Sequence, residues 1–186
     1  MTDEVWLVRH GETEWSRDGR HTSHTDVDLT DDGVLAAEQL RPRLADAPFD
    51  LVLVSPRTRA RRTAELAGLD DARLEDDLVE WDYGEFEGRT TEEIREDIPG
   101  WTIWTHPCPG GESSEQVSAR LDRVVSKVRA HGGRVLLVGH GHALRGLAAR
   151  WIGEDVRDGA HLRLDTATVS VLADERATPV IWRWNG

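Results

Sequence analysis

The feature that most constrains the fold is a pair of matching segments, VWLVRHG at 5–11 and VLLVGHG at 135–141. Each consists of four apolar residues, one intervening residue and then His-Gly. A third apolar run, LVLV at 51–54, is followed by Ser-Pro. Continuous apolar runs of this length, rather than alternating ones, are typical of strands that are buried on both faces of a parallel sheet. The sequence therefore predicts an α/β fold whose strands lie between layers of helices.

Segments with helical periodicity separate these predicted strands. Residues 30–45 carry apolar residues at helical spacing behind Thr30 as N-cap, and Pro42 predicts a kink or an early end. A helix over 57–68 should be closed by its final glycine, and one over 113–132 should open with a capping box. Residues 168–173 and 180–184 are predicted as closing strands. We expect a three-layer sandwich with a mostly parallel central sheet and helices on both faces.

The length of the chain predicts one domain over residues 1–186, with a sizeable core. The segment from about 76 to 111 departs from the alternation of strands and helices. It is rich in tryptophan and other aromatic residues. We predict that this segment is a small cap inserted over one end of the sheet.

The composition excludes several classes of partner. A net charge of -12 argues against binding to nucleic acid or to an anionic membrane, because both favour basic surfaces. Apolar runs of about five residues are far shorter than the roughly 20 that a membrane-spanning helix needs. The single cysteine, Cys108, permits no internal disulfide and favours a cytoplasmic location. A small anionic substrate stays compatible with the charge, because a few arginines in one cleft create a local positive potential.

The two His-Gly pairs point to a site at one edge of the sheet. Ligands of open α/β sheets bind beyond the carboxyl ends of the strands. His10 and His140 are therefore expected on the same edge, each followed by a glycine that lets backbone and ligand approach closely. A single histidine at a strand end is more often structural than functional, but two matched units favour a functional site.

The residues around these motifs give a more specific resemblance. LVRHGETEW at 7–15 resembles the signature of the histidine phosphatase superfamily, in its phosphoglycerate-mutase-like branch. Five further blocks follow in the order of that family: GRHTSHTDVDLTDDG, SPRTRARRTAEL, LVEWDYGEFEG, GGESSEQVSARL and LLVGHGHALR. The resemblance covers nearly the whole chain, and the form of the blocks is most similar to members that hydrolyse small phosphomonoesters.

The resemblance implies a role for five residues. His10 matches the nucleophile that becomes a phosphohistidine, with one ring nitrogen bonded to a backbone carbonyl and the other free. Arg9 and Arg59 match two phosphate clamps, since a guanidinium offers a fixed fork of donors. His140 matches the second pocket histidine, which donates to the phosphoryl group. Glu80 matches the general acid that protonates the leaving oxygen.

Three further residues are candidates for substrate binding. Ser16 and Thr22 stand where the family usually has asparagine and glutamine, and their hydroxyl groups can bond a phosphate oxygen. Gly141, which follows His140, lets the ligand approach the backbone closely. His142 either lines the pocket or merely begins the helix, and the sequence does not decide between these roles.

The sequence favours a phosphatase over the related alternatives. Mutases of this family hold a bisphosphorylated acid with a basic and aromatic stretch after the glutamate, whereas Asp82 stands here and is expected to repel a carboxylate. A bisphosphoglycerate-dependent phosphoglycerate mutase is the alternative enzyme, and a silent phospholigand-binding module is the alternative of another class. A metal hydrolase is disfavoured, because no H-E-x-x-H motif or aspartate-rich cluster accompanies His140 and His142.

The hypothesis is a metal-independent phosphomonoester hydrolase that needs no cofactor. Its partner is a small phosphorylated metabolite, with sugar phosphates among the candidates. Some relatives are dimers, so a homodimer stays open, and the natural substrate is not specified by the sequence.

Overall fold

The structure is a computed structural model of the chain, and it describes residues 4–186. Six strands form one mixed sheet in the order β3-β2-β4-β1-β5-β6. The strands are β1 (Glu4–Arg9), β2 (Leu51–Val54), β3 (Arg73–Leu74), β4 (Arg134–Gly139), β5 (Val169–Glu175) and β6 (Thr178–Arg183). The first four run parallel to one another, and β5 and β6 are antiparallel to their neighbours. The predicted mostly parallel sheet is confirmed.

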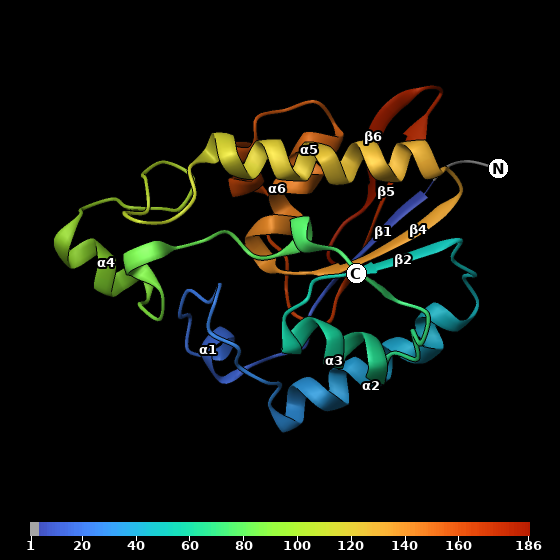
Figure 1. The fold of residues 1–186 in the computed structure, drawn as a ribbon, viewed down its shortest axis with the longest axis horizontal. Coiled ribbons are helices and arrows are strands. Elements are labelled where there is room, and N and C mark those ends of the chain that lie inside the picture. Colours follow the sequence, from blue (N-terminus) through green and yellow to red (C-terminus); the bar gives the residue numbers. More distant parts are fainter. Residues whose placement is uncertain (1–3) are drawn as a thin grey trace.

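Helices cover both faces of this sheet (Figure 1). The helices α5 (Ser114–His131) and α6 (Gly141–Trp151) lie on one face, and α2 (Asp31–Ala45) and α3 (Thr58–Leu66) lie on the other. Side chains of β1 alternate between the two cores. Leu7 packs with the α5 and α6 residues, and Val8 packs with those of α2 and α3. Burial on both faces explains why the central strands carry continuous apolar runs.

The helix boundaries agree with the capping signals in the sequence. The Thr30 side chain accepts from the Gly33 amide at 3.0 Å, and Ser113 forms a reciprocal capping box with Gln116. The α5 helix ends at His131, and its C-cap Gly132 has a φ of 70°, in the left-handed region that glycine tolerates.

The expected early end at Pro42 is wrong, because α2 continues to Ala45. Pro42 lies in the last turn of α2 on its exposed face. Only the carbonyl group four residues earlier, that of the exposed Glu38, loses its helical donor there, and water can satisfy it. The two-residue β3 strand was not predicted, since it is too short and too exposed to give an apolar pattern.

The segment 76–111 contains only short elements, which are the 3₁₀ turns Asp76–Leu78 and Gly84–Phe86 and the helix α4 (Thr91–Asp97). Figure 1 shows α4 set apart from the strands, at the end of the molecule where α1 (Glu14–Arg17) lies. The aromatic residues of the segment are buried in the same core as α5 and α6: Trp81, Tyr83, Phe86, Trp101 and Trp104. Within residues 4–186, no helix is long and apolar enough to cross a membrane.

Candidate active site

A cavity of about 250 Å³ lies at the carboxyl ends of β1 and β4. Of the residues predicted from the sequence, all except Arg59 and His140 line this cavity. Its wall is formed by Arg9, His10, Thr13, Ser16, Gly19, Arg20, His21, Thr22, Glu80, Tyr83, Thr91, Gly141, His142, Arg145 and Leu164. The edge of the sheet that the two His-Gly pairs indicated therefore carries a cavity.

His10 follows β1 directly and is held in one tautomer. Its Nδ1 lies 2.7 Å from the carbonyl oxygen of Gly11, so Nδ1 donates a proton to that carbonyl and Nε2 keeps its lone pair. Desolvation in the buried site, together with the charges of Arg59 and Arg9, lowers the pKa of His10 well below its usual value. The imidazole is therefore neutral near pH 7, which is the state that a nitrogen nucleophile needs.

His140 lies next to His10, with the two ring centroids 5.2 Å apart. Its Nδ1 accepts from Nε of Arg59 at 3.2 Å, and its Nε2 therefore donates to Oγ of Ser55 at 2.7 Å. The side chain is fully buried, and burial is the first cause of its lowered pKa. Both ring nitrogens of His140 are thus occupied by protein partners in this structure.

Arg59 lies in the first turn of α3, behind the cavity wall, and is 1% exposed. Its Nη1 donates to the carbonyl of Thr25 at 3.1 Å, and its Nη2 donates to those of Thr22 at 3.1 Å and Ser23 at 3.4 Å. Glu87 holds the same loop by accepting from the Ser23 and Thr25 amides. The guanidinium of Arg59 therefore fixes the 22–25 loop in this structure.

Arg9 lines the cavity and keeps a free donor. Its Nη1 donates to the carbonyl of Leu164 at 2.6 Å, whereas its buried Nε has no hydrogen-bond partner among residues 4–186. A Cβ at Gly141 would stand 3.4 Å from this Nε, so the main chain at the start of α6 packs closely against the guanidinium. A buried N–H without a partner is rare and costly, and an anion in the cavity would satisfy it.

Glu80 is 7% exposed, and its carboxylate lies at the start of α6. It accepts from the amides of His142 at 3.0 Å and Ala143 at 2.8 Å, and from its neighbour Trp81 at 2.9 Å. The N-cap residue His140 makes no side-chain cap, so Glu80 caps the helix from outside. These bonds fix the carboxylate at the cavity wall.

The two predicted hydroxyl groups line the cavity but already have main-chain partners. Oγ of Ser16 donates to the carbonyl of Thr13 at 3.0 Å and accepts from its amide at 2.9 Å. Oγ1 of Thr22 donates to the carbonyl of Arg20 at 3.0 Å. Each hydroxyl oxygen must therefore exchange a backbone partner before it can donate to a phosphate.

The expectation that Asp82 repels a substrate carboxylate is not supported by its position. Asp82 does not line the cavity. Its Oδ1 accepts from the amide of Gly84 at 2.9 Å, and its Oδ2 lies 2.9 Å from Nε2 of His24. The carboxylate of Asp82 is thus engaged by Gly84 and His24.

The wall also contains residues that the sequence did not assign to the site, among them His21, Tyr83, His142 and Arg145. His142 lines the cavity, and its Nδ1 lies 2.6 Å from Oη of Tyr83. Arg145 lies three residues after His142 on α6, a spacing that places both on one helix face and could have identified it. His21 packs against Tyr83 at a centroid distance of 4.7 Å, and burial lowers the pKa of His21 to about 4.

Comparisons with known proteins show the family of the chain. The family model for the histidine phosphatase superfamily (branch 1) matches residues 5–186. The chain is 43% identical to an acid phosphatase of Mycobacterium tuberculosis, over 91% of this chain and 85% of the relative. It is 35% identical to sedoheptulose 1,7-bisphosphatase of Saccharomyces cerevisiae, over 84% of this chain and 70% of the relative. A solved structure of an open reading frame product from Mycobacterium tuberculosis superposes with a TM-score of 0.96 at 40% identity, covering 100% of this chain and 98% of that one. The chain therefore belongs to branch 1 of the histidine phosphatase superfamily.

Proposed function

We propose that this protein is a metal-independent phosphomonoester hydrolase that acts on small phosphorylated metabolites through a phosphohistidine at His10. The observation that carries the proposal is the state of His10. Its Nδ1 is bound to the Gly11 carbonyl at 2.7 Å, and its pKa is lowered by burial and by two guanidinium groups. A neutral imidazole with Nε2 unprotonated is ready to attack phosphorus.

The first step forms a bond between Nε2 of His10 and phosphorus while the bond to the leaving oxygen breaks. Glu80 in its protonated form gives a proton to that oxygen, and the alcohol departs. The cationic Arg9, with its free Nε, stabilises the charge on the equatorial oxygens. In the second step, Glu80 takes a proton from water as the water attacks phosphorus, and the nitrogen–phosphorus bond breaks.

The proposed roles of Arg59 and His140 need a local exchange of partners. Arg59 is bonded to carbonyls of the 22–25 loop, and His140 donates to Ser55. A phosphoryl group is a stronger acceptor than a carbonyl or a hydroxyl group, because it is charged. We expect substrate to draw these donors toward it, and their charge and hydrogen bonds orient the site before substrate arrives.

The size and charge of the cavity support a small substrate. A volume of about 250 Å³ is at or below the lower end of the range for small-molecule sites. Arg20 and Arg145 add positive charge to the wall beside Arg9. The matched relatives named as an acid phosphatase and a sugar bisphosphatase support phosphorylated metabolites, and sugar phosphates in particular, as the substrate class.

The test is the release of inorganic phosphate, in EDTA, from a panel of sugar phosphates, phosphoglycerates and nucleotides. We expect turnover of at least one sugar phosphate by the native protein and loss of turnover in His10→Ala. His131→Ala, an exposed histidine at the end of α5, is the matched control and should retain native turnover. Loss of activity in EDTA would contradict a metal-independent route. Conversion of 3-phosphoglycerate to its 2-isomer with added bisphosphoglycerate, without phosphate release, would establish the mutase instead.

A further inference from the structure

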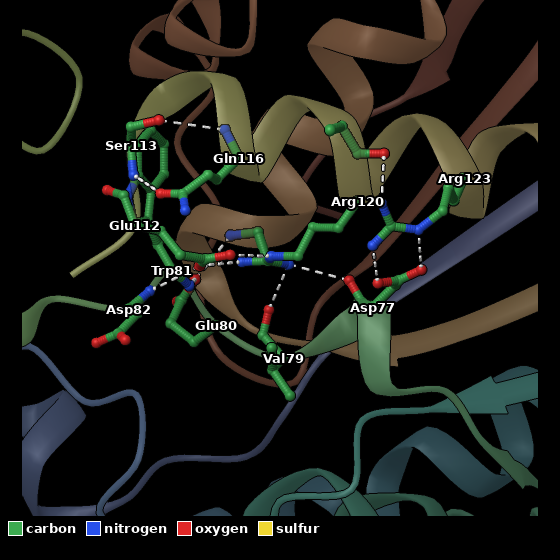
Figure 2. Close-up of polar contacts among 12 residues, drawn as sticks. Asp77, Val79, Glu80, Trp81, Asp82, Glu112, Ser113, Gln116, Arg120 and Arg123 are labelled. Atoms are coloured by element: carbon green, nitrogen blue, oxygen red, sulfur yellow. Dashed lines mark hydrogen bonds and ion pairs between the residues drawn. The ribbon is translucent and has the colours of Figure 1, made fainter.

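Arg120 of α5 is an unusually buried arginine, with 5% of its surface exposed. Its Nε and Nη2 donate to the two carboxylate oxygens of Glu112 at 2.7 and 2.9 Å. Its Nη1 donates to the main-chain carbonyls of Asp77 at 3.0 Å and Val79 at 2.9 Å (Figure 2). One guanidinium therefore joins α5 to the segment that leads into Glu80.

Glu112 holds the other side of Glu80. Its Oε2 also accepts from the amide of Asp82 at 2.9 Å. The main chain of Glu112 donates to the carbonyl of Asp82 at 3.0 Å and accepts from Nε1 of Trp81 at 3.0 Å. Figure 2 shows Glu80 between these two sets of contacts, with Val79 on one side and Asp82 on the other.

The two segments that meet here are packed backbone against backbone. A Cβ at Gly111 would lie 2.2 Å from the carbonyl oxygen of Asp82, and a Cβ at Gly84 would lie 2.1 Å from that of Pro109. Both distances are shorter than any real contact, so glycine is required at both positions. The close packing leaves the main chain around Glu80 little room to move.

We infer that Arg120 and Glu112 are positioning residues for Glu80 and hold its main chain so that its carboxylate reaches the leaving oxygen. The inference rests on the proposed function. Amides of α6 fix the carboxylate of Glu80, and the Arg120–Glu112 pair fixes the backbone that carries it. Removing one partner of this ion pair leaves the other charge uncompensated and lowers stability, so the test needs a readout that lost stability does not change.

The chain offers a matched control on the same helix. Arg123 lies one turn after Arg120 and donates from Nε and Nη2 to the carboxylate of Asp77 at 2.8 and 2.5 Å. Its side chain is 62% exposed, and its hydrogen bonds within the described part of the chain go to the Asp77 carboxylate and the Ala119 carbonyl rather than to Val79 or Asp82. Arg123→Met therefore removes an ion pair to the same segment without touching the bonds that flank Glu80.

The experiment compares kcat/KM for p-nitrophenyl phosphate and phenyl phosphate in the native protein and in Glu80→Gln, Arg120→Met, Glu112→Gln and Arg123→Met. The p-nitrophenolate group leaves without help, whereas phenolate needs a proton from a general acid. The ratio of kcat/KM for p-nitrophenyl phosphate to kcat/KM for phenyl phosphate reports on the placement of the acid. A smaller fraction of folded protein lowers both values equally and leaves this ratio unchanged. A misplacement of the catalytic group by about 1 Å is enough to lower the rate roughly 10²-fold.

We expect Glu80→Gln and Arg120→Met to lower kcat/KM for phenyl phosphate by about 10²-fold more than for p-nitrophenyl phosphate. Glu112→Gln should shift the ratio in the same direction, and it preserves the shape of the side chain if Arg120→Met fails to fold. Arg123→Met should keep the native ratio. Equal losses on both esters in Arg120→Met and Glu112→Gln, or the same shift in Arg123→Met, would overturn the inference. A native protein that hydrolyses neither ester would overturn the proposed function itself, and an unchanged ratio in Glu80→Gln would remove its acid role.

Discussion

Nε of Arg59 donates to Nδ1 of His140 at 3.2 Å, and this contact determines which nitrogen of His140 carries the proton. The proton lies on Nε2, which donates to Oγ of Ser55 at 2.7 Å. Ser55 directly follows β2, so residues after three neighbouring strands, β1, β4 and β2, meet at one edge of the sheet. Arg59, His140 and Ser55 thus form a row of hydrogen-bonded side chains whose orientation is set without substrate.

Ser55→Ala tests this row. The substitution leaves the buried Nε2–H of His140 without an acceptor, so we expect the free energy of unfolding to fall by about 1–3 kcal/mol. Urea unfolding at pH 7 measures this free energy, with Ser126→Ala, at an exposed serine of α5, as control. A change as small as that of the control would show that the bond to Ser55 contributes nothing.

The free energy of unfolding should fall as the pH drops below about 6.5. Burial lowers the pKa values of His10, His21, His140 and His142, that of His21 to about 4. At a pH between the lowered pKa in the folded protein and the ordinary pKa in the unfolded chain, the unfolded chain binds protons that the folded protein does not. The free energy of unfolding therefore has its full value above about pH 6.5. Below that pH, protonation of each of these histidines in the unfolded chain lowers it by up to about 1.4 kcal/mol per pH unit.

Urea unfolding between pH 7 and pH 5.5 measures this slope, in a range where most carboxylates stay ionised. The variant His21→Asn should show a shallower slope than the native protein, because one of the four histidines is removed. A free energy of unfolding that does not change with pH in this range would contradict the neutral state of the site.

Glu87 should be required for the order of the 22–25 loop. Its carboxylate accepts from the amides of Ser23 and Thr25 and from Oγ of Ser23 at 2.6 Å. We expect Glu87→Ala to lower the free energy of unfolding by about 1–3 kcal/mol. It should also speed proteolytic cleavage near residues 22–25.

The control for this prediction is Glu92→Ala, an exposed acid in the same part of the chain. Equal cleavage rates in the two variants would mean that other contacts, such as those of Arg59, are enough to hold the loop.

Much of this architecture was predictable because it depends on local signals. The apolar runs identified the central strands, and Thr30 and Ser113 marked the helix starts. The shared edge of His10 and His140 followed from the rule for ligands of parallel sheets. Their ring centroids are indeed 5.2 Å apart.

The partners of the site residues were less predictable, because they lie far away in the sequence. Arg59 and His140 are 81 residues apart in the sequence. The hydrogen bonds from the Arg59 guanidinium to carbonyls of the 22–25 loop depend on the path of that loop in the folded chain. Asp82 was expected to face substrate, but its contact with His24 arises only when the two segments meet. The role of Arg120 is of the same kind, since its spacing on α5 matches an ordinary core position.

The most direct test of the central claim is a trap for the phosphorylated enzyme. The protein is mixed with p-nitrophenyl phosphate labelled in the phosphoryl group and is denatured in alkali within milliseconds, and the peptides are then mapped. We predict label on the peptide that contains His10, stable to alkali and lost in acid, and none on His10→Ala. Rapid turnover of the ester with no label on the protein, or label that persists in His10→Ala, would contradict the phosphohistidine route.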